Sequence, residues 1–581
     1  MSVASPRQLA SEFAARLPRR LPVRAIAAGA GLLVALLAGV LLLTGGRPAE
    51  ELVAERFVAA WERDDFAAMH AELSSDSRRA TPLTEFTADY RRSAATATAL
   101  SVKAGEVGEL RDGIVAVPVT VRTRLVGAVR ATLSVPFDGT GDEARIDWAR
   151  NLTFPGVRRG DRLERRTRLP PRADILARDG RTLAEGPERR SPLGPAATSI
   201  VGRIEDPPKE DRQRLRELGY PSGSRVGVSG LERVFEERLA GRPGGVLRAG
   251  GTLFGTSEPE TAQAVRTTID PDVQRAATEV LGERVGGIAV MRPRNGEILA
   301  LSGIAFSGLS PPGSTFKIVT LAGVLEAGLA GPKSKYPVQT TTQLEGVNVE
   351  NANGESCGGT LRDSFAHSCN SVFAPLGATL GAERLVRAAE AFGFNEDLGI
   401  PGAVTSTLPP ADEIGDDLAV GSSAIGQGKV QSTALQMALV ASTIAGRGRR
   451  PKLTLERGRP PVRKRAIATR TARIVARYME AVVREGTGRA AAINRVRVAG
   501  KTGTAELRST ATPNCLPTAG APCPPPAAND PTDTDAWFAA FAPANSPRVA
   551  VGVLLVASGA GGESAAPVAR EVLLAGLRAT R

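Results

Sequence analysis

The stretch Pro311-Pro-Gly-Ser-Thr-Phe-Lys317 carries the residues on which the fold and the chemistry of this chain depend. Two prolines and a glycine interrupt any preceding element, so a helix is predicted to begin at Ser314. Ser314 and Lys317 are three positions apart, which places both side chains on one helix face with Cβ atoms about 5 to 6 Å apart. A desolvated lysine can remove the proton of a serine and so activate it as a nucleophile. The alternative is ordinary capping, in which Ser314 only caps the helix.

The choice of lysine favours the catalytic interpretation. Of the 74 basic residues in the chain, nine are lysine and the rest are arginine. Arginine does not lose its proton in proteins, so it cannot act as a general base. A lysine placed one turn after a serine, in a chain that otherwise uses arginine, indicates a role that arginine cannot fill.

A second motif, Ser368-Cys-Asn370, lies 54 residues after Ser314. In an extended or tight-loop conformation, the side chains of Ser368 and Asn370 project to the same side of the chain. One hydroxyl and one amide are therefore expected to face the nucleophile.

A third motif, Lys501-Thr-Gly-Thr504, lies 133 residues after Ser368 in a predicted strand over residues 496–505. Gly503 has no side chain, so a substrate backbone is expected to approach the strand there. Lys501 and Thr502 supply a cation and a hydroxyl that suit a carboxylate. Each motif alone is more often structural than functional, but the three together in this order are a strong signal of a functional site.

The motifs lie in a predicted catalytic domain of the α/β or α+β class over residues 266–578. Residues 287–290 and 298–301, joined through Asn295-Gly296, have the pattern of a hairpin, and residues 548–556 have that of a buried strand before a C-terminal helix. Further helices are predicted over residues 314–327, 382–392, 434–445 and 471–485.

A long apolar run lies near the start of the sequence, before the predicted catalytic domain. Residues 25–44 (AIAAGAGLLVALLAGVLLLT) form an uncharged run of 20 residues, long enough to cross about 30 Å of hydrocarbon. The preceding residues 1–24 carry five arginines against one glutamate, which predicts a cytoplasmic N-terminus and an extracytoplasmic chain after Arg47. We therefore expect one transmembrane anchor over residues 25–46. A cleaved signal peptide is the alternative, but the run is longer than usual and no clean cleavage site follows it.

Two smaller regions are predicted between this anchor and the catalytic domain. Residues 48–157 read as an α+β domain, with a helix over residues 49–65 and alternating valines at 115–121 and again after Gly127. Residues 158–265 are rich in Gly, Pro and charge and read as a β-rich pedestal, in which Asp179-Gly180 forms a hairpin turn.

Composition excludes several other functions. Aromatic residues make up 4% of the chain, too few for the stacking platforms that bind single-stranded nucleic acid. The net charge of +13 is consistent with a coding bias towards arginine, and it also suits a protein that works beside anionic membrane or wall polymers. Nucleic acid is not an expected partner, because the chain after Arg47 is predicted to be extracytoplasmic. The four cysteines lack metal-ligand spacing, and His70 and His367 lie far apart, so neither a metal site nor a Ser-His-Asp triad is expected.

The combination of S-x-x-K, S-x-N and K-T-G resembles the acyl-serine transferases that bind penicillin. Residues 227–241 (GVSGLERVFEERLAG) and 267–274 resemble the dimerisation module of class B penicillin-binding proteins and its junction to the transpeptidase domain, and residues 424–428 and 536–538 also look like segments of that family. The domain at 48–157 is similar to the nuclear-transport-factor-like domain of the methicillin-resistance type. The chain departs from the family at Ser310, where an aromatic residue is usual, and at Arg172-Ala173, where Arg-Gly is usual.

The resemblance implies a role for each motif residue. Ser314 would attack a D-Ala carbonyl of a stem peptide, with Lys317 as general base, and Ser368 would relay the proton to the leaving nitrogen. Asn370 would hold the substrate amide. The backbone N–H groups of Ser314 and Thr504 would form the oxyanion hole. No cofactor is implied.

The resemblance also implies partners and leaves other functions open. It implies stem peptides as substrates, β-lactams as inhibitors and a separate membrane glycan polymerase as partner. A D,D-carboxypeptidase or β-lactamase, an idle scaffold in division or elongation, and a penicillin-sensing receptor are the other functions considered.

The cysteines suggest two disulfides outside the membrane. Cys515 and Cys523 bracket a Pro-rich insertion and are expected to pair across it. Cys357 and Cys369 pair likewise or remain as buried thiols, and the sequence leaves that choice open.

Overall fold

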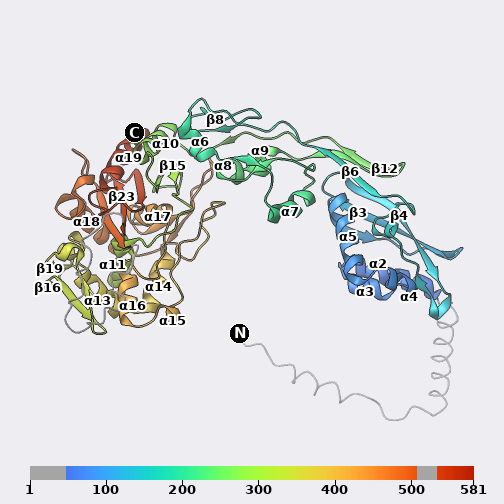
Figure 1. Cartoon of the computed structure of the whole chain (residues 1–581), viewed down its shortest axis with the longest axis horizontal. Coiled ribbons are helices and arrows are strands. Elements are labelled where there is room, and N and C mark those ends of the chain that lie inside the picture. Colours follow the sequence, from blue (N-terminus) through green and yellow to red (C-terminus); the bar gives the residue numbers. More distant parts are fainter. Residues whose placement is uncertain (1–46, 507–532) are drawn as a thin grey trace, which may run out of the picture. The chain divides into compact units, whose positions relative to one another are not determined.

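The computed structural model describes residues 47–506 and 533–581, so the anchor predicted at 25–46 and the pair Cys515 and Cys523 lie outside the described residues. Within these two ranges, no helix is long and apolar enough to cross a membrane. The chain divides into two compact units (Figure 1). Among the described residues, the first unit contains 47–167 together with 216–219 and 245–257, and the second unit contains the others.

The first unit packs helices against a curved antiparallel sheet. The helices are α2 (Ala49–Trp61), α3 (Phe66–Ala71), α4 (Ser75–Ala80) and α5 (Leu83–Ala97). The sheet has the order β1-β3-β4-β5, with β2 paired to β3; its strands are β1 (Ala99–Ala104), β2 (Leu110–Arg111), β3 (Ile114–Thr123), β4 (Gly127–Asp138) and β5 (Arg145–Ile146). The alternating valines of β3 are all buried, which confirms the strand that their alternation at 115–121 predicts.

A second sheet in this region has the order β12-β11-β6, with β6 (Leu163–Arg168), β11 (Gly244–Ala249) and β12 (Thr252–Ser257). Leu247 is fully buried in the core of the first unit, and Phe254 packs against Phe154 with ring centroids 5.2 Å apart. The hairpin at 245–257 therefore belongs to the first unit, although it lies inside the sequence range expected to form the pedestal.

The part of the second unit that precedes the catalytic sheet consists of short elements. Two small sheets are formed by β7 (Ile175–Leu176), β8 (Thr182–Ala184) and β13 (Val265–Arg266), and by β9 (Ile204–Glu205) and β10 (Val226–Gly227). The helices are α6 (Pro195–Val201), α7 (Arg212–Glu217), α8 (Gly230–Val234) and α9 (Glu236–Ala240). Strands β7 and β8 are antiparallel, and Gly180 between them has a φ of +97°, which confirms the predicted turn at Asp179-Gly180.

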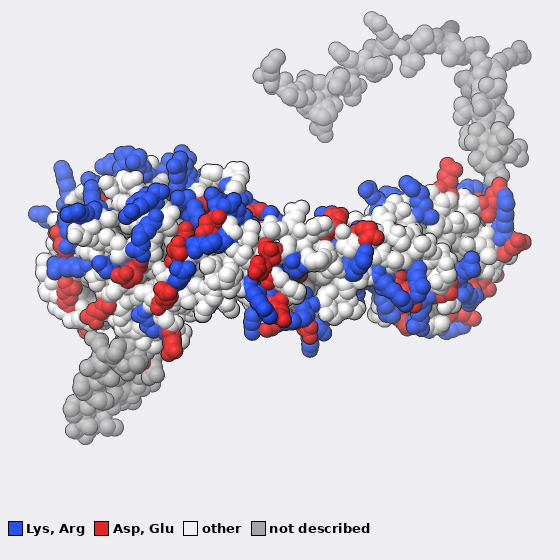
Figure 2. All heavy atoms as spheres, turned by 90° about the horizontal axis from the view of Figure 1, so that it is seen from above, with Lys and Arg blue, Asp and Glu red and all other residues white. Residues whose placement is uncertain are grey.

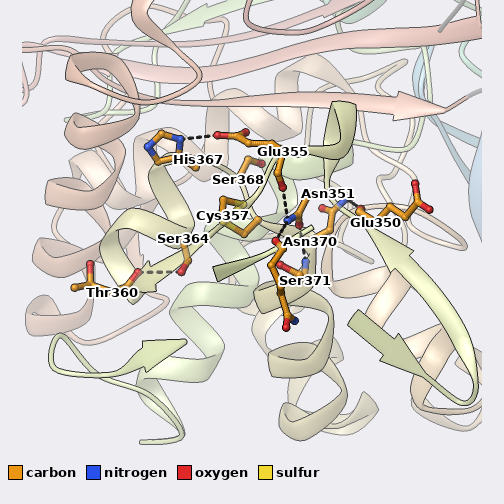
Figure 3. Close-up of a disulfide and its surroundings, with 12 residues drawn as sticks. Glu350, Asn351, Glu355, Cys357, Thr360, Ser364, His367, Ser368, Asn370 and Ser371 are labelled. Carbon is orange, nitrogen blue, oxygen red and sulfur yellow. Dashed lines mark hydrogen bonds and ion pairs between the residues drawn. A yellow bond between two sulfur atoms is a disulfide. The ribbon is translucent and has the colours of Figure 1, made fainter. Parts of the chain in front are cut away.

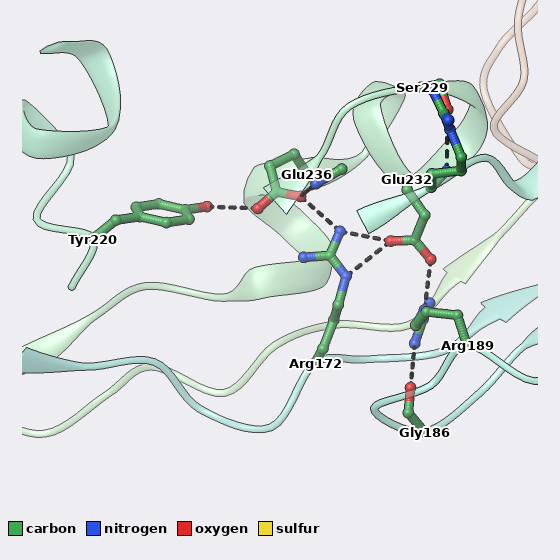
Figure 4. Close-up of polar contacts among 9 residues, drawn as sticks. Arg172, Gly186, Arg189, Tyr220, Ser229, Glu232 and Glu236 are labelled. Carbon is green, nitrogen blue, oxygen red and sulfur yellow. Dashed lines mark hydrogen bonds and ion pairs between the residues drawn. The ribbon is translucent and has the colours of Figure 1, made fainter. Parts of the chain in front are cut away.

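A buried ion network holds these short elements together (Figure 4). Glu232 on α8 is fully buried and accepts hydrogen bonds from Arg172 and Arg189. Arg172 also donates to Glu236, whose carboxylate accepts the backbone N–H of Gly227 at 2.8 Å. Each buried carboxylate thus has charged partners, without which burial would be costly.

The catalytic half of the second unit is built on a five-stranded antiparallel sheet of order β15-β14-β24-β23-β22. The strands are β14 (Gly286–Met291), β15 (Ile298–Gly303), β22 (Ala499–Glu506), β23 (Thr534–Ala542) and β24 (Val549–Leu555). Alternate residues enter two cores. Ile288 and Phe538 belong to the core with α10 (Pro271–Leu281) and α19 (Ala565–Ala579). Ala289 and Trp537 belong to the core with α11 (Lys317–Glu326), α17 (Ala434–Ala445) and α18 (Thr469–Arg484).

Helix α17 (Ala434–Ala445) spans the residues predicted for it and is buried almost throughout. It packs closely on β24, because a Cβ at Gly552 would come within 2.0 Å of the Ala434 carbonyl oxygen. The remaining helices of this half are α11 (Lys317–Glu326), α12 (Leu361–Ala366), α13 (Asn370–Leu380), α14 (Ala382–Ala391), α15 (Ala411–Ile414), α16 (Asp417–Ala424) and α18 (Thr469–Arg484). Its outer strands are β16 (Lys335–Gln339), β17 (Thr341–Leu344), β18 (Val347–Glu350), β19 (Cys357–Thr360), β20 (Arg449–Pro451) and β21 (Arg463–Arg465).

Candidate active site

Ser314 lies in a single 3-10 turn, Gly313–Phe316, immediately before α11. The α-helix begins at Lys317, three residues later than predicted. The backbone of this turn is tightly confined: Gly313 has a φ of +51°, and its N–H donates to the Gly426 oxygen at 2.9 Å. A Cβ on Gly313 would come within 2.6 Å of the Thr504 oxygen, on strand β22. Ser314 is therefore held against the K-T-G strand by contacts that leave no room for a side chain at position 313.

Lys317 is fully buried one turn after Ser314. Its Nζ donates to the backbone oxygen of Ser368 at 2.6 Å, to Asn370 Oδ1 at 2.6 Å and to Ser368 Oγ at 3.3 Å. Burial lowers the pKa of Lys317 well below its ordinary value, and the charge of Lys501 lowers it further. A buried amine with a depressed pKa is what a lysine general base requires.

Ser368 lies between the two buried lysines. Its Oγ is 2.8 Å from Lys501 Nζ and 3.3 Å from Lys317 Nζ. Lys501 is fully buried as well, and burial lowers its pKa to about 7. Ser368 has a φ of +63°, a conformation that a non-glycine residue adopts rarely and that is frequent at functional sites. A hydroxyl between two amines whose pKa values are both lowered by burial can pass a proton from one to the other.

Asn370 begins helix α13. Its Oδ1 accepts from Lys317, and its Nδ2 donates to the Glu350 backbone oxygen at 2.8 Å (Figure 3). Both ends of the amide are thereby oriented. The sequence predicts that Ser368 and Asn370 face the nucleophile, and the structure brings both side chains to Lys317.

A disulfide joins Cys357 on β19 to Cys369, the residue between Ser368 and Asn370 (Figure 3). The two Cα atoms are 5.8 Å apart. The sequence left this pairing open against free buried thiols, and the structure joins the two residues. The middle residue of the S-x-N motif is therefore covalently tied to a neighbouring strand.

Strand β22 presents the third motif. Thr502 Oγ1 is 2.6 Å from Thr487 Oγ1, and Thr504 Oγ1 accepts from the Gly561 N–H at 3.3 Å. The structure gives a further reason for glycine at position 503, because the space that a Cβ would need is occupied by protein. A Cβ there would come within 2.7 Å of the Pro312 oxygen and 3.0 Å of Thr315 Cγ2. Glycine is needed so that the loop bearing Ser314 can pack on the strand.

The sequence analysis did not assign several residues that orient the site. Asn351 is buried, and its Oδ1 accepts from the Ser371 N–H at 2.8 Å while its Nδ2 donates to the Gln339 and Glu355 oxygens. Gln427 donates to the Thr504 oxygen at 3.4 Å. Gln427 lies in the segment 424–428 already noted, but Asn351 has no local sequence signal, because its partners lie in three separate elements.

Ser310 departs from the family pattern, and the structure shows how the change is accommodated. Its Oγ donates to the buried carboxylate of Asp535, on β23. The Ser310 and Ser432 backbones exchange hydrogen bonds at 3.1 and 2.9 Å. The loop before Ser314 is therefore held by hydrogen bonds.

The contacts of His367 indicate a structural role. Its Nδ1 is 2.8 Å from Glu355 Oε1, and its side chain is 43% exposed. Within residues 47–506 and 533–581, no group of three His, Cys, Asp or Glu side chains is arranged to hold a metal ion. The chemistry of the site depends on the Ser368 hydroxyl, which lies between the amines of Lys317 and Lys501.

Three domain families match the chain. They are the penicillin-binding protein transpeptidase domain at residues 286–574, the penicillin-binding protein dimerisation domain at 179–249 and the NTF2-like N-terminal transpeptidase domain at 49–161. The chain is 32% identical over 426 residues to the peptidoglycan D,D-transpeptidase PbpA of Mycolicibacterium smegmatis, covering 62% of this chain and 81% of that protein. The peptidoglycan D,D-transpeptidase PbpA of Mycobacterium tuberculosis is 30% identical over 420 residues, covering 61% and 80%.

Solved structures agree with these matches. The crystal structure of PBPA from Mycobacterium tuberculosis has a TM-score of 0.55 and 26% sequence identity, and the match covers 70% of this chain and 99% of that one. Its ceftriaxone acyl-enzyme complex matches with the same TM-score of 0.55 and covers 70% and 98%. The chain belongs to the class B penicillin-binding proteins, with an NTF2-like N-terminal domain, a dimerisation domain and a serine-type transpeptidase domain.

Proposed function

We propose that this protein is a peptidoglycan D,D-transpeptidase that cross-links stem peptides through an acyl-enzyme on Ser314. The observation that carries this proposal is the position of Ser368 Oγ, 3.3 Å from Lys317 Nζ and 2.8 Å from Lys501 Nζ. Lys317, one turn after Ser314, can act as the base, and Ser368 offers a path by which the same proton reaches a leaving group.

In the first half-reaction, neutral Lys317 accepts the proton of Ser314 as Oγ attacks the carbonyl carbon of the penultimate D-Ala. The negative charge that develops on the carbonyl oxygen is stabilised by the backbone N–H groups of Ser314 and Thr504, each such donor being worth about 2.7–4 kcal/mol in other acyl transferases. The C–N bond then breaks, an ester remains on Ser314, and Ser368 delivers a proton to the departing amine of the terminal D-Ala.

In the second half-reaction, the amine of a neighbouring stem peptide attacks the ester and takes the place of the first leaving group. Its proton returns along Ser368 and the lysines to Ser314 Oγ. In the first half-reaction, before the C–N bond breaks, Asn370 holds the amide of the donor peptide, and Lys501 with Thr502 binds the carboxylate of its terminal D-Ala through charge-assisted hydrogen bonds. A β-lactam would enter the same site and acylate Ser314.

We also propose that the protein is anchored in the plasma membrane. The anchor at 25–46 holds it in the plasma membrane, with residues 1–24 in the cytoplasm and the domains at 48–157, 158–265 and 266–578 outside. A separate membrane glycan polymerase would supply the strands that this enzyme joins.

The test is intact mass spectrometry of the detergent-purified full chain with benzylpenicillin, followed over time. We expect a lasting adduct of one drug mass on the wild type, none on Ser314→Ala, and a normal adduct on the matched control Ser307→Ala, which alters an exposed serine in the loop before the motif.

Other outcomes would contradict the proposal in different ways. An adduct that disappears within seconds identifies a hydrolase. No adduct, together with no turnover of a stem-peptide thioester, identifies a non-catalytic scaffold. An adduct that persists on Ser314→Ala shows that another residue is the nucleophile.

A further inference from the structure

A cavity of about 510 Å³ lies in the second unit, lined by none of the active-site residues. Its walls come from the turn after α17, from α18 and from the segment before β22. Five arginines line it: Arg447, Arg470, Arg473, Arg477 and Arg497. Arginines from three separate elements thus converge on one hollow.

Helix α18 presents its arginines in a row. Arg470, Arg473 and Arg477 are exposed and follow an i, i+3, i+7 spacing, which places them on one helix face. The opposite face buries apolar residues such as Val475 and Met479. Among the described ion pairs at this cavity, Arg497 is paired with Glu480 at 2.6 Å, whereas none involves Arg470, Arg473 or Arg477.

The net charge of the chain is concentrated here. Twelve of its 74 basic residues, but only one of its 61 acidic residues, lie between positions 447 and 477. This stretch therefore carries a net +11 of the chain's +13, and the remaining 550 residues are close to neutral. Arginines are spread along the sequence, but the excess positive charge is local, so a coding bias alone does not explain it.

The strand pair next to α18 adds to this concentration. Strands β20 and β21 are antiparallel, and their register places Arg449 opposite Arg465 and Arg450 opposite Lys464. Arg450 is buried and pairs with Glu396, but Arg449, Lys464 and Arg465 are exposed. Like charges directly opposite each other destabilise a strand pair, and a bound anion would offset that cost. Figure 2 shows Lys and Arg side chains crowding one edge of the unit that carries the transpeptidase sheet.

We propose that the arginine-lined cavity on α18 and the adjoining β20–β21 ribbon bind a linear polyanion with a phosphodiester backbone. Guanidinium groups bind phosphate oxygens bidentately, and arginines from several elements can hold the several oxygens of one phosphate. The β20–β21 strand pair extends the positive charge beyond the cavity, which suits a ligand with repeated negative charges. This binding function goes beyond the cross-linking reaction and does not rest on it.

Two other kinds of partner fit less well. A membrane surface is normally met by exposed aromatic or large apolar side chains, whereas Ile444 and Phe541 in the cavity are buried to 2% and 1% exposure. A peptide groove offers deep apolar pockets for anchor side chains, whereas most of the apolar lining here is alanine and proline: Ala445, Ala472, Ala476, Ala544, Pro332 and Pro547.

The test uses the detergent-purified full chain and a fluorescein-labelled glycerol-phosphate oligomer, with binding measured by anisotropy at several salt concentrations. The variant Arg470→Ala/Arg473→Ala/Arg477→Ala removes the α18 row. The matched control Arg122→Ala/Arg124→Ala/Arg130→Ala removes three exposed arginines of the first unit, with the same change in net charge.

We expect the wild type and the control to bind alike. The α18 variant should bind at least about tenfold more weakly at low salt, with the slope of log K against log salt reduced by about 2, as expected for the loss of three phosphate contacts. Labelling of Ser314 by a fluorescent penicillin, together with the melting temperature, establishes that each variant is folded.

The following results would overturn the proposal. Equal binding by the α18 variant and the control would show that the attraction is only the net charge. Binding of a glutamate oligomer in preference to the glycerol-phosphate oligomer would identify an acidic peptide, and binding only to phosphatidylglycerol vesicles would identify a lipid surface.

Discussion

Two lysines, Lys317 and Lys501, determine how the active site responds to pH. Both are fully buried, and burial disfavours the charged form of an amine. The pKa of Lys317 falls well below its ordinary value, and that of Lys501 falls to about 7. Burial therefore favours a neutral Lys317, the form that a general base requires, beside a Lys501 that is about half protonated near pH 7.

We predict a bell-shaped pH dependence for the second-order rate constant of acylation by benzylpenicillin. The rate rises with pH as Lys317 loses its proton. It falls above about pH 7, because Lys501 then loses the charge that binds the substrate carboxylate and the proton that passes to Ser368. The measurement is stopped-flow acylation from about pH 5 to about pH 10, a range that brackets the Lys501 pKa of about 7.

Two lysine-to-arginine variants test whether Lys501 causes the fall in acylation rate on the alkaline limb of the pH profile. Lys501→Arg keeps its charge at every pH in this range, so the alkaline limb should disappear although the rate itself is lower. Lys335→Arg, at an exposed position, is the matched control and should keep the wild-type profile. A wild-type rate that stays constant above pH 7, or an unchanged alkaline limb in Lys501→Arg, would show that Lys501 does not act as a cation in acylation.

At the scale of elements, strand β19 and helix α13 are joined at the active site by the Cys357–Cys369 disulfide. The bond closes a short loop, with a sequence separation of 12 residues. It restrains a segment in which Ser368 already has a positive φ and Asn370 is hydrogen-bonded at both ends of its amide. The cross-link therefore positions two motif residues as well as stabilising the fold.

We predict that Cys357→Ala/Cys369→Ala loses about 2–3 kcal/mol of stability, since disulfides that close loops of this size contribute about that much. Acylation should slow by about tenfold or more, because small displacements of catalytic groups are costly. Thermal melting and the acylation rate are measured together. A reductant should reproduce both effects in the wild type and leave the variant unchanged. An unchanged acylation rate with a lowered melting temperature would restrict the disulfide to a structural role.

At the scale of the whole molecule, the described chain forms two compact units with separate hydrophobic cores. Ser314 and every motif residue lie in the second unit. A ligand stabilises the unit to which it binds and leaves an independent unit unchanged.

We predict two transitions in differential scanning calorimetry of the full chain. Acylation by benzylpenicillin should move one transition, that of the second unit, and leave the other within error of its position. Ser314→Ala treated with the drug serves as the control and should show no shift. A single transition that moves as a whole would show that the two units unfold cooperatively.

The sequence by itself determined the secondary structure wherever the apolar pattern is strong. Helix α17 spans the residues predicted for it, and the alternating valines of β3 are buried as expected. This success has a local cause, because the period of the apolar residues records which face of an element is covered. The three motifs were also evident from the sequence, because their chemistry depends on residue type and short spacing.

The tertiary structure alone decided how the motifs meet. The position of Ser368 between Lys317 and Lys501 depends on packing between segments that are 51 and 133 residues away. Packing between distant segments also determines three other features: the close approach at Gly503, the role of Asn351 and the assignment of residues 245–257 to the first unit. A local pattern cannot specify contacts between distant elements, nor the burial that lowers a lysine pKa, because both depend on the packing of the entire chain.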